Sequence, residues 1–150
     1  MKFHIGLYHE YTKLQKEEII KAKIANRKEY SYLLNPEFTV EQMRMLRQGL
    51  ENGIDISFYA DPRYSTAQMR EVSTALLLYK NSLNGIKKRD LLTLHNIRTY
   101  LLDWNLTVAQ MKKVTDVLYY GMSEDLRDEA MELGIEFDID EDEIDMDIER

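Results

Sequence analysis

The feature that most constrains this chain is a short pattern that occurs three times. A Ser or Thr is followed three positions later by Gln and then by Met, and an apolar residue precedes it, in residues 38–43, 64–69 and 106–111. This is the capping box of a helix N-terminus, in which the hydroxyl accepts from a backbone N–H and the Gln side chain bonds back to the cap. The pattern therefore predicts helices that begin after Thr39, Ser65 and Thr107.

The segments between these starts favour further helices and short connections. Gly53 is expected to end the first of these helices in the left-handed conformation. Residues 54–62 are expected to form an extended connector, because Pro62 cannot continue a helix. Ser123 is a candidate cap for a last short helix, and residues 131–137 echo the first helix end. Another amphipathic helix is predicted from the spacing of Leu91, Leu94, Ile97, Tyr100 and Leu101.

The N-terminal part has a different character. Apolar residues alternate with others over residues 2–8, which leaves a short strand open there. Residues 12–34 are rich in Lys and Glu, and we expect a long helix that packs through Leu14, Ile20 and Ile24. Its exposed face would carry Lys13, Lys16, Lys21, Lys23, Arg27 and Lys28.

Residues 36–80 resemble a degenerate repeat of Firmicutes mobile-element and prophage proteins. The resemblance rests on Gln42-Met43, Gly49-Leu50-Glu51, Gly53-Ile54-Asp55-Ile56-Ser57, Tyr59-Ala60, Pro62 and Gln68-Met69. It implies a mobile-element setting, and the family has no established activity. The second copy has Tyr79 in place of the helix-ending glycine, so its helix is expected to run on.

We therefore expect an all-α fold: a small bundle of capped amphipathic helices built from degenerate repeats. Its parts would be a basic N-terminal helix (1–35), a helical repeat body (36–134) and an acidic tail (135–150). The chain has no Cys, no long apolar stretch and no signal-peptide pattern, which favours a cytoplasmic protein with no membrane contact.

Catalytic signatures are missing from the sequence. The histidines at positions 4, 9 and 95 have no metal-ligand spacing, and His95 is expected to be partly buried in a helix. There is no phosphate loop, nucleophile elbow or recognisable pair of catalytic acids. We expect a binding protein without enzymatic activity and without a cofactor.

The net charge of −7 hides a strong separation, since residues 1–121 sum to +5 and residues 122–150 to −12. From Glu136 to Glu149, apolar residues are interspersed among acids. In an extended chain, alternate carboxylates lie about 6–7 Å apart, near the phosphate spacing of a nucleic-acid strand. Nucleic-acid mimicry is thus one hypothesis, and a disordered solubilising tail is another. The candidate partner-binding acids are Asp138, Asp140, Asp142, Asp145 and Asp147.

A calcium loop is a third interpretation of the tail, with ligands at Asp138, Asp140, Asp142 and Glu149. Glu143 stands where such a loop needs glycine, so no metal site is predicted. Tyr119 and Tyr120 join the candidate partner-binding residues, because tyrosine is enriched in interfaces. The expected partner is a basic, nucleic-acid-handling protein, as for an anti-CRISPR or anti-restriction inhibitor. The alternative is a structural adaptor or self-associating module that uses Tyr- and Met-bearing helix faces. Direct nucleic-acid binding is not favoured.

Overall fold

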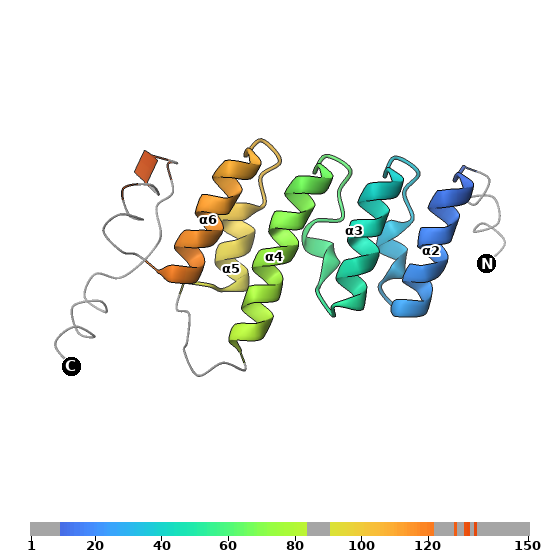
Figure 1. The fold of residues 1–150 in the computed structure, drawn as a ribbon, viewed down its shortest axis with the longest axis horizontal. Helices are drawn as coiled ribbons and strands as arrows, with labels where there is room; N and C mark the ends of the chain where they lie inside the picture. Colours follow the sequence, from blue (N-terminus) through green and yellow to red (C-terminus); the bar gives the residue numbers. More distant parts are fainter. Residues whose placement is uncertain (1–9, 84–90, 122–127, 129–130, 133, 135–150) are drawn as a thin grey trace.

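The computed structural model describes residues 10–83, 91–121, 128, 131–132 and 134. Within these residues every element is helical, which confirms the all-α prediction. The long helices stand side by side in a row, with α2 at one end and α6 at the other, and the shorter helices lie between and behind them (Figure 1). The elements in chain order are α2 (Lys13–Ala25), η1 (Tyr30–Leu33), α3 (Val40–Glu51), η2 (Ile56–Phe58), α4 (Thr66–Ser82), α5 (Leu94–Asn96), η3 (Ile97–Leu101) and α6 (Val108–Tyr120).

Four helices begin with a complete capping box, one more than the sequence pattern predicted. The boxes at Thr39, Ser65 and Thr107 are confirmed. The additional box joins Thr12 to Gln15 at the start of α2, where the Gln side chain accepts from the Thr12 backbone nitrogen at 2.8 Å. The pattern missed this copy because Lys follows Gln15, where the other three have Met. α2 therefore begins in the same way as the repeat helices.

The basic N-terminal helix is shorter than predicted, and it packs through a different face. α2 ends at Ala25, because the Asn26 side chain accepts from the backbone of Lys28 and Glu29 and turns the chain into η1. The predicted apolar stripe is wrong, because Leu14, Ile20 and Ile24 are exposed by 57%, 56% and 80%. The buried residues are Gln15, Glu18, Ile19 and Ala22.

Further expectations concern helix ends and connectors. Gly53 has a φ of +70°, so the predicted left-handed helix end is confirmed, and Gly134 in the predicted echo has a φ of +71°. α4 runs on to Ser82, as expected from Tyr79. The extended connector is wrong over Ile56–Phe58, which form a short 3-10 helix capped by the Asp55 side chain. The predicted helix near residue 97 is present as α5 followed by the π-helix η3. The possible strand and the Ser123 cap lie outside the described residues.

The Gln of the first three capping boxes also ties its helix to the next repeat. The Nε2 atom of Gln42 donates to the carbonyl oxygens of Pro62 and Tyr64, at 3.0 and 2.7 Å. We call this pair of hydrogen bonds the inter-repeat clamp. Two further clamps join Gln15 to Pro36 and Phe38, and Gln68 to Trp104 and Leu106.

The loop that receives each clamp has the same internal geometry in all three places. The side chain at the loop start accepts from the backbone nitrogen two residues later at 2.9 Å. Such an Asx turn needs Asn or Asp. The loop therefore offers its two carbonyl oxygens in a fixed arrangement. The turn residues are Asn35, Asp61 and Asp103.

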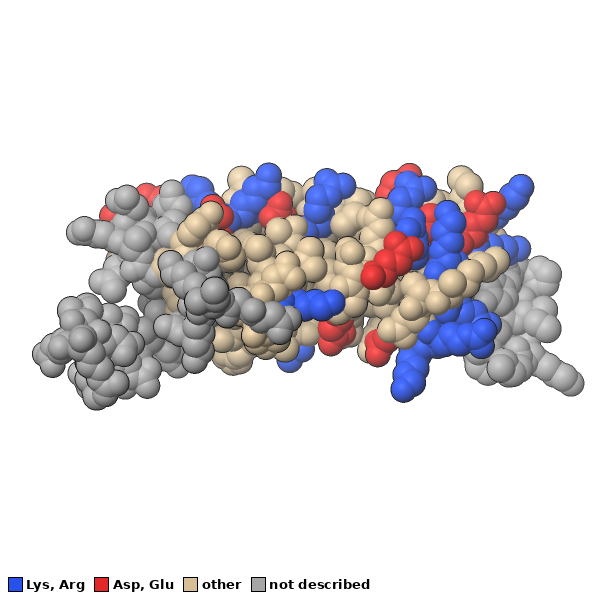
Figure 2. Space-filling view, turned by 60° about the horizontal axis from the view of Figure 1, so that its bottom comes forward, with Lys and Arg blue, Asp and Glu red and all other residues tan. Residues whose placement is uncertain are grey.

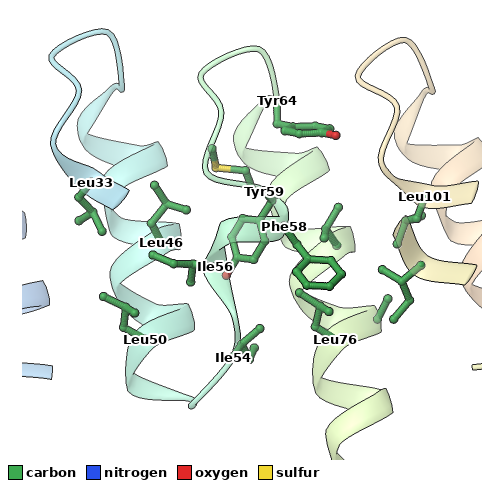
Figure 3. Close-up of a cluster of buried hydrophobic side chains, with 14 of the residues drawn as sticks. Leu33, Leu46, Leu50, Ile54, Ile56, Phe58, Tyr59, Tyr64, Leu76 and Leu101 are labelled. Carbon is green, nitrogen blue, oxygen red and sulfur yellow. The ribbon is translucent and has the colours of Figure 1, made fainter. Parts of the chain in front are cut away.

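The core runs through the row between the long and the short helices (Figure 3). Met43, Met69 and Met111, the capping-box methionines, are fully buried. The Gln-Met pairs are thus explained by capping, clamping and packing.

A close fit between Gly49 and Tyr59 fills the layer between α3 and η2. A Cβ atom on Gly49 would overlap the Tyr59 hydroxyl and lie 2.7 Å from Ile56 Cγ2. The equivalent pairs in the neighbouring repeats are Ala22 with Leu33 and Ala75 with Leu101, and all four of these side chains are fully buried. The bulkier aromatic ring thus occurs where the helix has no side chain, which keeps the layer filled.

The clamp predicts a large and position-specific cost for Gln42→Glu. The carboxylate would keep the capping box but would face the carbonyl oxygens of Pro62 and Tyr64 with no proton to donate. We expect a loss of about 2–4 kcal/mol in the free energy of unfolding, measured by urea denaturation. Gln110→Glu is the matched control, since the Gln110 amide donates to no described carbonyl, and we expect a change within about 0.5 kcal/mol. Equal effects in the two variants would contradict a role for the clamp.

The fit at Gly49 predicts strong coupling between two substitutions. Gly49→Ala should destabilise the fold by about 1–3 kcal/mol, because the new methyl group meets Tyr59 and Ile56. Tyr59→Phe removes the overlapping oxygen, so Gly49→Ala should cost clearly less in that background. A double-mutant cycle by thermal or urea unfolding measures this coupling. Purely additive effects would show that the hydroxyl is not the obstacle.

The buried hydroxyl of Tyr59 should also make the free energy of unfolding depend on pH. Burial raises the pKa of its hydroxyl from 10.0 to about 12, and the nearby Ser73 hydroxyl offsets only part of this effect. Between these two values the folded chain holds a proton that the unfolded chain has released, so stability is complete below pH 10 and falls as the pH rises toward 12. In Tyr59→Phe this part of the decline should disappear from denaturation curves measured across that range. An unchanged slope would contradict the assignment.

Candidate interaction surfaces

Most of the predicted partner-binding residues cannot be placed. The acids of the tail, from Asp138 to Asp147, and the alternative calcium ligand Glu149 lie outside the described residues. In the part of the chain that the structure describes, no group of three or more His, Asp or Glu side chains could hold a metal ion. His95 is exposed on α5, so the expectation of a partly buried histidine is wrong.

Tyr119 and Tyr120 lie at the C-terminal end of α6 and differ in exposure. Their rings meet edge to face, with centroids 4.9 Å apart. Tyr119 packs against the core, whereas Tyr120 is 67% exposed. Tyr120 is thus available at the surface, and Tyr119 supports it from below.

The other residues of the adaptor hypothesis are mostly inside the protein. The three capping-box methionines are buried and do not contribute to a surface, whereas Met45 of α3 is partly buried. Tyr11, Tyr59 and Tyr64 are buried as well. Burial raises the pKa of the Tyr64 hydroxyl, with the carboxylate of Asp61 adding to the effect.

Lys and Arg side chains gather over the N-terminal end of the body (Figure 2). Most of the predicted basic face is confirmed as exposed, and Lys16 is half-buried. Part of this charge is balanced by Glu18, whose buried carboxylate lies 2.9 Å from Arg47 and 3.4 Å from Arg44 on α3. Lys21 also lies 3.9 Å from Glu18, and the other exposed bases of this region give it a positive surface. The exposed members are Lys13, Lys21, Lys23, Arg27 and Lys28.

A second set of cations follows from the repeat itself. Arg44, Arg70 and Lys112 each stand two residues after a capping-box Gln, on three helices of the row. All three are exposed. Packed helices lie about 8–10 Å apart, so one cation stands at this position on each of α3, α4 and α6. The equivalent residue of α2 is Glu17. The sequence could have revealed the row by aligning the repeats on their Gln residues.

The only Trp of the chain lies in the loop before α6, within a cluster that joins two neighbouring loops. The Arg63 guanidinium stacks over the Trp104 ring, 3.7 Å from its centroid, and the Tyr64 ring meets that ring edge-on. Arg63 also donates to the Asp61 carboxylate and holds its pKa below the usual value. Trp104 is 41% exposed, so the cluster both joins the loops and leaves aromatic surface in contact with solvent.

Helices of membrane-spanning length and hydropathy do not occur among the described residues. No family model matches the chain, and neither a curated protein nor a solved structure matches it.

Proposed function

We propose that this chain is a non-enzymatic binding protein, in which a helical-repeat scaffold presents a partner-binding surface. The observation that carries the proposal is the set of three inter-repeat clamps. Each clamp fixes one long helix to the loop before the next, so side chains at equivalent positions keep a constant spacing along the row. Repeat proteins commonly use such regular surfaces to bind extended partners.

The outer surface of the row is the part of the scaffold best suited to this role. It carries Arg44, Arg70 and Lys112 on α3, α4 and α6, and the exposed ring of Tyr120 lies at the end of α6. Arg44 also lies 3.4 Å from Glu18, and Lys112 lies 3.9 Å from Glu71. Arg and aromatic residues are enriched at protein interfaces. The partner that fits this surface is a protein with an acidic, extended segment.

A second candidate function rests on the charge separation. Residues 122–150 carry −12, and between Asp138 and Asp147 the acids are interspersed with Ile139, Ile144 and Met146. Such a segment suits a basic channel that normally holds nucleic acid, since long-range attraction would steer the two together. Together with the resemblance to mobile-element repeats, this favours an inhibitor of the anti-CRISPR or anti-restriction type, located in the cytoplasm.

Two variants separate these candidates. A partner is first captured from a host lysate at low salt and purified, and its Kd is then measured for each variant. If the scaffold binds the partner, Arg70→Glu with Lys112→Glu should weaken binding at least about tenfold, and removal of residues 136–150 should change the Kd little. If the tail binds it, the truncation should abolish binding together with its salt dependence. Binding that survives in the charge variant and fails in the truncation would overturn the scaffold proposal.

A further inference from the structure

Two ion pairs join neighbouring long helices at the same positions of the repeat. The carboxylate of Glu18 on α2 lies 3.4 Å from the Arg44 guanidinium on α3. The carboxylate of Glu71 on α4 lies 3.9 Å from the Lys112 amine on α6. In each pair the acid stands three residues after the capping-box Gln of one helix, and the cation stands two residues after the Gln of the next long helix. We call these two contacts the inter-helix pairs.

Between α3 and α4 the same positions hold a cation without an acid. The cation is Arg70, and the residue three positions after Gln42 is Met45. Met45 is partly buried and packs against the core, so an apolar side chain stands where the other two places have a glutamate. Arg70 is exposed, and its guanidinium makes no ion pair or hydrogen bond within the part of the chain that the structure describes. The repeat pattern thus leaves this cation open to a carboxylate from another molecule.

Arg70 also differs from the other two cations of the row in what it offers to a partner. Arg44 already faces the carboxylate of Glu18. Lys112 likewise faces the carboxylate of Glu71. A partner acid at either place would compete with a carboxylate that belongs to the fold. An Arg can bind a carboxylate through two parallel hydrogen bonds, which a Lys cannot, and Arg is enriched at interfaces where Lys is depleted.

We propose that Arg70 is the main contact for an acidic residue of the partner, whose carboxylate takes the place of the missing glutamate. This inference rests on the proposed function, and it names the binding residue and the chemistry that the residue recognises. Met45 gives the site an apolar neighbour. In an extended segment, residues two apart face the same side at about 6.6 Å. The segment that fits best therefore has an acid and an apolar residue two positions apart.

The apolar neighbour increases the strength of the contact. A fully exposed ion pair contributes little, because water and salt screen it. A segment that covers Met45 removes part of the water around the carboxylate, and the hydrogen bonds between the carboxylate and Arg70 then become stronger. Loss of Arg70 should therefore weaken binding more than loss of Arg44, whose charge is already paired inside the protein.

Titration with a synthetic peptide tests the proposal, with the Nε–Hε signals of the Arg side chains followed by NMR. The peptide has the sequence Glu-Ser-Leu-Ser twice, and a second peptide with Gln in place of Glu is the uncharged probe. We expect the largest shift at Arg70, little change at Arg44 and no binding of the uncharged peptide. Arg70→Gln should raise the Kd at least about tenfold, whereas Arg44→Gln removes the same charge and should change the Kd less than about threefold.

Met45→Glu is a sharper variant, because it keeps Arg70 and supplies the glutamate that the repeat lacks there. The new carboxylate should pair with Arg70 and raise the Kd of the peptide at least about tenfold. Gln48→Glu is the matched control, since it adds the same charge at an exposed position on the next turn of α3. We expect it to change the Kd less than about threefold. Thermal unfolding shows that each variant is folded.

Four results would overturn the proposal. Equal effects of Arg70→Gln and Arg44→Gln would show that the row attracts acids as a whole, and the proposed function would stand. Equal effects of Met45→Glu and Gln48→Glu would have the same meaning. A shift of the Arg70 signal when residues 136–150 are removed, with no peptide present, would make the tail of the chain itself the occupant. A peptide that binds nowhere on the row would contradict the scaffold function as well.

Discussion

The structure depends on the side-chain amide of the capping-box Gln, because both its oxygen and its nitrogen make hydrogen bonds. In the first three capping boxes the Gln oxygen accepts from the backbone of its own helix cap, and the Gln nitrogen donates to two carbonyl oxygens of the next loop. A carboxylate could serve the cap but not the loop, and a Ser or Asn side chain is too short to serve both. The amide therefore links local helix formation to the placement of the next repeat. This link fixes which face of each helix is buried, including that of α2, where Gln15 and Ile19 turn inward and Ile20 and Ile24 do not.

The packing between the long and the short helices follows from the placement of each loop. Once a loop is fixed to the preceding helix, the residues of the short helix behind it must fill the space that remains. Tyr59 does so against Gly49, whereas Leu33 and Leu101 occur where the long helix carries Ala. The repeats thus share a backbone arrangement while their core side chains differ, which explains why the repeats are so degenerate in sequence. Large and small residues change together, and the hydrogen bonds of the clamp stay the same.

A row of repeats has two ends, and the charge of this chain is divided between them. The N-terminal end carries exposed lysines and isoleucines on α2, and the acidic residues follow α6. The middle of the row is nearly balanced, partly because Glu18 is enclosed by Arg44 and Arg47. The two candidate functions therefore draw on different charges, since the scaffold proposal uses Arg44, Arg70 and Lys112 and the mimicry proposal uses the acidic residues.

The sequence by itself determined the local structure, because capping boxes, left-handed glycines and Asx turns involve residues only two to four positions apart. Thr39, Ser65 and Thr107 as helix starts and Gly53 as a helix end could be predicted for this reason. The tertiary structure alone decided which faces are buried. Ile20 and Ile24 have the spacing of a core stripe, yet the clamp at Gln15 directs them outward. It also decided that the capping-box Gln binds a loop more than twenty residues away. Contacts of this kind depend on how the repeats stack, and the local spacing of residues in the sequence does not predict that stacking.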